Sequence, residues 1–77
     1  MIAASRQAQA IERLIAARGE QSLPPQLLQT AKLRLLYPEV SLEELGRLCD
    51  PPVGKSGVNH RLRKLEQMAK ELEESRP

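Results

Sequence analysis

The sequence predicts a small all-α domain, a helical bundle of about four helices that contains a helix-turn-helix. Three observations lead to this fold class. Apolar residues recur at spacings of three and four, the period that places them on one face of a helix. Prolines and glycines interrupt this pattern and divide it into four segments. The 77 residues fall below the ~100–150 typical of a domain, so the chain has room for one modest core.

The first helix is expected at residues 2–18, and Gly19 follows it with the residue type that most often ends a helix. The segment GEQSLPP then forms a linker, in which Ser22 is positioned to cap the next helix. The apolar stripe of the first helix consists of Ala4, Ala8, Ile11, Leu14 and Ile15.

The second helix is expected at Pro25–Leu36, because prolines at residues 24 and 25 are tolerated in a first turn. It must end near Tyr37, since Pro38 disfavours helical geometry in the residue before it. Its predicted buried face consists of Leu27, Leu28, Ala31 and Leu35.

The third helix is short, at about residues 42–48, and opens with a capping box formed by Ser41 and Glu44. Gly46 lies in its middle, where glycine costs about 0.5–1 kcal/mol relative to alanine. This cost indicates that another helix approaches closely there. The inward residues are expected to be Leu42, Leu45 and Leu48.

The fourth helix follows the break DPPVG and runs over about residues 55–74. Its apolar face is predicted to consist of Val58, Leu62, Leu65, Ala69 and Leu72, flanked by Met68. The opposite face holds Ser56, His60, Arg63 and Gln67, with Asn59 and Lys64 beside it.

Composition argues against several functional classes. The single cysteine, Cys49, and the single histidine, His60, cannot build a four-ligand zinc site, so we expect no metal and no cofactor. Cys49 is interpreted as a small apolar residue at a helix end. Ser56 and His60 stand four residues apart, but no third group orients the histidine, so no catalytic residue is expected. No apolar run approaches the ~20 residues of a membrane span, and a cytoplasmic protein fits best.

Positive charge is concentrated on one element. Residues 51–65 carry four basic residues and no acid, a local charge of +4. The rest of the chain carries eight basic residues and ten acids, a net −2. Such a distribution is typical of proteins that bind a polyanion.

The last two helices form the predicted helix-turn-helix at residues 41–65, in which the second helix enters the major groove of DNA with its N-terminal residues. Forked or two-sided hydrogen-bonding side chains suit base edges, and we assign Asn59, His60 and Arg63 to them. Gly57 adds no bulk in the first turn and lets the backbone come close to the partner. The residues assigned to phosphates are Lys55, Ser56, Arg61 and Lys64, of which Arg61 lies nearest the core.

Residues 22–72 resemble the C-terminal domain of WhiA-type sporulation transcription regulators of Gram-positive bacteria. The segment SGVNHRLRKL at residues 56–65 is the specific part, supported by LPP and SLEELG. The resemblance implies a helix-turn-helix similar to the promoter-reading region of sigma factors. It also implies that the chain is detached from an N-terminal domain built like a LAGLIDADG homing endonuclease without nuclease activity. The positions that match the family's recognition segment are Lys55, Ser56, Asn59, His60, Arg61, Arg63 and Lys64.

Two departures from related sequences are visible. Many family members have a serine where this chain has Gly54. If Gly54 is the N-cap, glycine in place of serine lowers the stability of the helix by only about a few tenths of a kcal/mol. Compared with simple bacterial helix-turn-helix sequences, residues 50–52 read as about three extra residues in the turn, which leaves the crossing angle of the two helices open.

The sequence thus divides into an N-terminal helix and linker at residues 1–21 and a DNA-binding domain at residues 22–77. The expected function is binding of double-stranded DNA in transcription control of sporulation and cell division, at the nucleoid. The alternative is a protein-interaction module that docks its basic helix on an acidic partner, such as RNA polymerase or another regulator. A merely solvated basic face is the simplest alternative, and RNA binding is the least favoured, given one aromatic residue.

Overall fold

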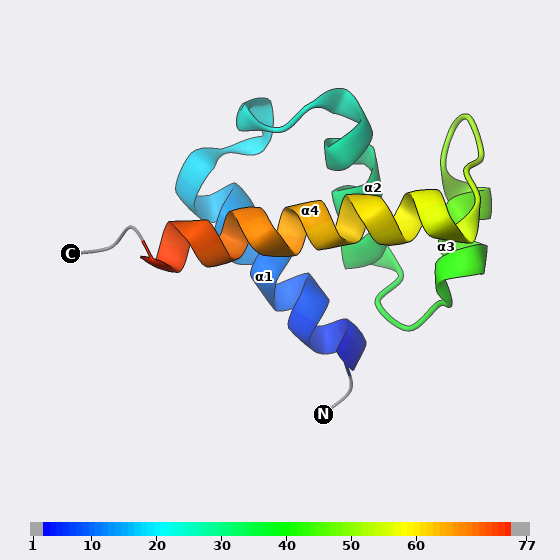
Figure 1. Cartoon of the computed structure of the whole chain (residues 1–77), viewed down its shortest axis with the longest axis horizontal. Helices are drawn as coiled ribbons and strands as arrows, with labels where there is room; N and C mark the ends of the chain where they lie inside the picture. The colour runs from blue at the N-terminus through cyan, green and yellow to red at the C-terminus, as the bar shows by residue number, and fades with distance from the viewer. Residues whose placement is uncertain (1–2, 75–77) are drawn as a thin grey trace.

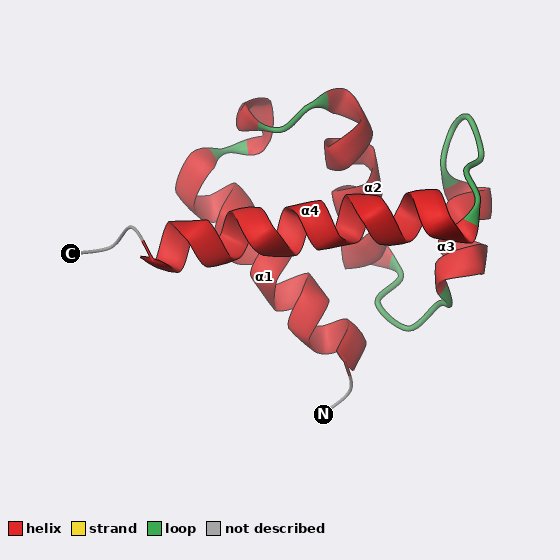
Figure 2. Ribbon diagram, in the orientation of Figure 1, coloured by secondary structure: helices red, strands yellow, loops and turns green. Residues whose placement is uncertain are grey.

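The computed structural model describes residues 3–74, and the side chains of residues 6–74. Figure 2 shows an all-α fold, and the described residues contain no strand. The expected fold class is therefore confirmed, with one short 3-10 helix added in the linker. The elements are α1 at Ala3–Arg18, η1 at Glu20–Ser22, α2 at Pro25–Leu36, α3 at Leu42–Leu48 and α4 at Lys55–Glu74.

The bounds of α2, α3 and α4 are those expected from the sequence. Helix α1 is described from Ala3, and Ile2, its predicted first residue, lies outside the described part of the chain. The agreement follows from strong local signals: Gly19 has a positive φ of 82° after α1, and Pro38 follows the end of α2.

Helix α4 is the axis of the bundle, and the other three helices pack against it (Figure 1). Helices α1 and α2 cross it, while α3 lies beside its N-terminal end. The core joins all four helices in one apolar cluster rather than two. Its fully buried members are Ile11 and Leu14 of α1, Ala31 of α2, Leu45 of α3, and Val58, Leu62 and Leu65 of α4.

The buried face of α2 differs from the apolar face expected. Leu27 and Ala31 are buried as predicted, whereas Leu28 and Leu35 are only partly buried. Thr30 and Arg34 complete the buried face instead. A polar side chain can be buried where it is hydrogen-bonded, and the Thr30 hydroxyl donates to the carbonyl of Gln26 over 3.0 Å. An apolar pattern alone cannot reveal such positions.

The two predicted caps have different outcomes. The backbone N–H of Glu44 donates to Ser41 Oγ over 3.1 Å, which confirms Ser41 as the N-cap of α3. The prediction for Ser22 is wrong: its hydroxyl donates to the carbonyl of Gly19 within η1, and Pro24 occupies the N-cap of α2. The 3-10 turn places Ser22 too early in the chain to reach the first turn of α2.

At the end of α3, the residue that faces the core differs from the one expected. Leu45 is fully buried and Leu42 partly buried, but Leu48 is 43 % exposed, so its predicted inward position is wrong. Cys49 takes that place in the core, with 3 % of its surface exposed. The helix ends at Leu48 and the backbone becomes extended at Cys49, which redirects the side chain inward. The interpretation of Cys49 as a small apolar residue at a helix end is confirmed.

Candidate nucleic-acid interface

The first half of α4 has one buried face and one exposed face. Val58, Leu62 and Leu65 lie in the core, each with at most 1 % of its surface exposed. This apolar face fixes the rotation of the helix on the domain, so the remaining positions must point outward. The exposed members of the predicted site are Lys55, Ser56, Gly57, Asn59, His60, Arg63 and Lys64, which we call the basic face.

Arg61 is the one predicted site residue that does not lie fully on the basic face. It is half-buried, and its guanidinium donates to Thr30 Oγ1 over 3.4 Å. The contact joins α4 to α2 and agrees with the position of Arg61 near the core. The side chain therefore contributes to holding α4 on the domain.

The cations of the basic face have no acidic partner within the described residues. The ion pairs found there join Arg13 to Glu73, Lys32 to Glu20 and Arg47 to Glu43, all on other parts of the surface. Because residues 51–65 contain no acid, the positive charge of the basic face is not neutralised locally. The face therefore keeps a positive potential that attracts anions.

The turn between α3 and α4 is anchored on both sides. The side-chain amide of Gln29 donates to the carbonyl of Asp50 over 3.0 Å, and its oxygen accepts from the Asp50 N–H over 3.3 Å. The backbone N–H of Val53 donates to the carbonyl of Gly46 over 3.0 Å. These bonds connect the longer turn to α2 and α3 and determine where α4 begins.

Gly46 is required by a close backbone approach. A Cβ there would collide with the carbonyl oxygen of Val53, and would lie 3.1 Å from Cγ2 of Val58. The expected close approach of another helix is thus found at Val58, and the turn itself comes closer still. The glycine allows α3, the turn and α4 to meet without an intervening side chain.

Gly57 has a different environment. It is exposed, and a Cβ there would lie 3.6 Å from Cβ of Val53, an ordinary contact. Packing within the chain does not require a glycine at this position. The carbonyl of Gly54 accepts the N–H of Val58 over 3.1 Å, which places Gly54 at the N-cap position of α4.

Arg34 organises the turn between α2 and α3. It is 3 % exposed, and one guanidinium nitrogen donates to the carbonyls of Tyr37, Pro38 and Val40 at 3.2, 3.3 and 2.9 Å. Burial lowers the pKa of Arg34 from its usual value, because desolvation disfavours the charged form. Sequence reasoning missed this residue, although it continues the three- and four-residue spacing of Leu27 and Ala31.

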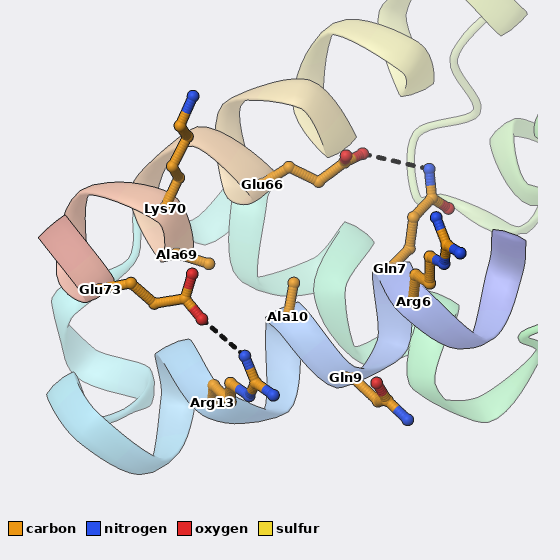
Figure 3. A pocket seen from close by; sticks show the side chains of 9 residues that line it. All are labelled: Arg6, Gln7, Gln9, Ala10, Arg13, Glu66, Ala69, Lys70 and Glu73. Atoms are coloured by element: carbon orange, nitrogen blue, oxygen red, sulfur yellow. Dashed lines mark hydrogen bonds and ion pairs between the residues drawn. The ribbon is translucent and has the colours of Figure 1, made fainter.

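The described residues contain neither a cluster suited to a metal ion nor a helix suited to a membrane. No group of three or more His, Cys, Asp or Glu side chains could hold a metal ion between residues 3 and 74. In the same part of the chain, no helix is long and apolar enough to cross a membrane. Three hollows of the surface lie along α1 and the second half of α4, and none is lined by a residue of the basic face. Figure 3 shows one of them.

A short helix, an anchored turn and a longer helix with an exposed basic N-terminal half define a helix-turn-helix domain. The model of one family, described as the WhiA C-terminal HTH domain, matches residues 1–69. The chain belongs to this family, and the resemblance noted in the sequence is confirmed.

Curated relatives carry the name "Probable cell division protein WhiA". The relative from Clostridium beijerinckii is 54 % identical over 74 residues, 96 % of this chain and 24 % of its own length. Those from Thermoanaerobacter pseudethanolicus and Clostridium perfringens are 51 % and 56 % identical, over 96 % and 91 % of this chain and 23 % and 22 % of their own lengths. The chain thus spans about a quarter of these relatives. No solved structure matches it.

Proposed function

We propose that this domain binds double-stranded DNA by placing the first half of α4 in the major groove. The observation that supports this proposal best is the basic face itself, whose cations are exposed and have no acidic partner among residues 3–74, while the opposite side of the same helix is buried in the core. A rigidly held helix with a free positive end suits a groove lined by phosphates.

Each residue of the basic face has a proposed role. Arg63, His60 and Asn59 contact base edges, because each of these side chains carries more than one hydrogen-bonding group. Gly57 lets the duplex approach the backbone of the first turn. Arg61 remains a proposed phosphate contact that also ties α4 to α2 through Thr30. The other proposed phosphate contacts are Lys55, Ser56 and Lys64, helped by the positive end of the helix dipole.

The test is a titration of labelled random duplex with the isolated domain at two salt concentrations. Binding at low salt that weakens steeply as salt rises is expected, because phosphate contacts release counterions. A failure to bind any duplex at low salt would refute the proposal. Selection of bound sequences from a random duplex library then identifies the preferred site.

In the whole protein, we propose that the domain directs a transcription regulator of sporulation and cell division to its DNA sites. The name of the curated relatives supports the connection to cell division. Their greater length leaves room for the LAGLIDADG-like N-terminal domain that the resemblance implies. A DNA-bound regulator of this kind acts at the nucleoid in the cytoplasm. The family match favours a role in binding without chemistry.

The second candidate is docking of the basic face on an acidic protein, such as RNA polymerase or another regulator. The same exposed cations favour it, because they would attract a carboxylate-rich surface as they attract phosphates. The duplex titration separates the two candidates when its result is negative: a domain that binds no random duplex at low salt leaves only docking on an acidic protein. Both functions can coexist on one face.

A further inference from the structure

The exposed side of α4 changes the sign of its charge halfway along the helix. Ser56, His60, Arg63 and Gln67 follow one another along its outer face, and the next positions on that face are Glu71 and Glu74, both exposed. Residues 55–64 carry four basic residues and no acid, a net +4. Residues 66–74 carry four acids and one base, a net −3.

The flank of the negative half is covered by α1. The side-chain amide of Gln7 donates to Glu66 over 3.2 Å, and Arg13 forms an ion pair with Glu73 over 2.6 Å (Figure 3). The hollow beside these contacts, of about 420 Å³, is lined by both acidic and basic side chains. This flank therefore offers no continuous positive surface along which a phosphate backbone could run.

The positive half of α4 is long enough to cross the major groove without the negative half. The 20 residues of α4 make a helix about 30 Å long, of which the positive positions 55–64 occupy about 15 Å. The major groove is about 12 Å wide, so the positive half alone is sufficient to cross it. A helix lying lengthwise in the groove would bring Glu71 and Glu74 near phosphates, within the ~8–10 Å over which charges repel at physiological salt.

We propose that Glu71 and Glu74 restrict DNA to the first half of α4, so that the duplex meets the N-terminal end and the last turns point away from it. The inference rests on the proposed DNA binding and adds to it the groups that exclude other poses of the duplex along α4. The two carboxylates act by repelling alternative poses, which affects random duplex most. Binding to random duplex is almost entirely electrostatic, whereas a selected site is also held by base contacts.

The test compares Glu71→Lys with Glu12→Lys, an exposed position on α1 that receives the same change of charge. For Glu71→Lys we expect roughly tenfold tighter binding of random duplex at 50 mM salt and a salt slope steeper by about one. The ratio of selected-site to random-site affinity should fall. The variant Glu71→Gln, which loses only one charge, should show about a threefold gain. Glu12→Lys should change these affinities less than twofold.

Two results would overturn the inference while leaving the proposed function intact. Equal gains in Glu71→Lys and Glu12→Lys would show that only net charge matters. Unchanged affinity in Glu71→Lys would show that DNA never comes near the second half of α4 in any pose. If the unaltered domain binds no duplex at low salt, the proposed function fails first, so the two failures are distinguishable. Circular dichroism of each variant checks that the fold is intact.

Discussion

Single residues around the two turns determine where α4 starts and what it presents. Gly46 allows the backbone of the turn to reach α3, and Arg34 holds the preceding turn through three carbonyls. Both residues act on the basic face from a distance, because they position the helix that carries it. The residues of the face itself can be tested one at a time.

Arg63→Ala should weaken binding to a selected DNA site by about 1–3 kcal/mol and relax its sequence preference, because a base-edge contact is lost. Lys64→Ala should weaken binding to all sequences alike and lower the salt slope by about one, as expected for a phosphate contact. Titrations of selected and random duplexes measure both effects. If both variants bind like the unaltered domain, the assigned face is wrong.

Gly57→Ala should stabilise the domain by up to about 1 kcal/mol, since alanine favours the helix and the structure has room for its methyl group. The same variant should bind DNA more weakly, because the methyl group stands where the duplex is proposed to approach. Urea denaturation and duplex titration measure the two quantities. Unchanged DNA affinity would remove Gly57 from the interface.

Gly46→Ala is the control for that experiment. Here the added methyl group would collide with the Val53 carbonyl, so the substitution should destabilise the domain instead of stabilising it. A stabilised Gly46→Ala variant would contradict the packing of the turn against α3.

Arg34→Met should lower the free energy of unfolding by roughly 2–3 kcal/mol, because the carbonyls of Tyr37, Pro38 and Val40 lose their charged donor. Methionine keeps most of the volume, so the loss reports hydrogen bonding more than packing. Arg47→Met, at an exposed position on α3, serves as the matched control and should stay within about 0.5 kcal/mol. Equal stabilities of the two variants in urea would show that Arg34 is dispensable.

At the scale of elements, α1 and α4 share one core rather than belonging to separate units. Ile11 and Leu14 are fully buried in the same cluster as Leu62 and Leu65. The boundary predicted between residues 21 and 22 stays a prediction, since this packing concerns stability and not the limits of DNA contact. Helix α1 shares the core with the buried face of α4 and also reaches Glu66 and Glu73 on one flank of that helix.

Leu14→Ala should therefore destabilise the whole domain by about 2–5 kcal/mol, the usual cost of removing a buried leucine side chain. The matched control is Leu36→Ala, a leucine that is 70 % exposed and should change stability by no more than about 0.5 kcal/mol. Urea denaturation followed by circular dichroism measures both. Survival of α2–α4 as a separate folded unit, seen as a second transition, would contradict a shared core.

At the scale of the whole molecule, charge is distributed more unevenly than the net charge of +2 indicates. Lys55, Arg63 and Lys64 are exposed in the first half of α4, while residues 66–74 of the same helix carry a net charge of −3. Such an arrangement orients the molecule in the field of a polyanion before contact.

If the three cations assigned to phosphates, Lys55, Arg61 and Lys64, all neutralise them, the logarithm of the affinity should fall with the logarithm of salt at a slope of about −2.7. Between 50 and 200 mM salt, random-duplex affinity should then fall roughly 40-fold. Fluorescence anisotropy over this range checks the slope. A slope near zero would show that the basic face does not contact the DNA backbone.

Local signals in the sequence by themselves determined the helices of this domain and most of the basic face. The bounds of α2, α3 and α4 follow from Pro25, Pro38, Ser41 and the break before residue 55, because caps and prolines act on neighbouring backbone. Because the apolar stripe of α4 is buried, the polar residues on the opposite side of the helix must face the solvent. The membership of Lys55, Asn59, His60, Arg63 and Lys64 in one exposed face was therefore predictable.

Only the tertiary structure decided the features that depend on residues distant in the chain. The burial of Thr30 and Arg34, the inward turn of Cys49 and the contact of Arg61 with Thr30 require neighbours that no local period specifies. The exposure of Leu48 has the same origin. A side chain is buried by what packs over it, and hydrogen bonds from another element can make even an arginine part of the interior.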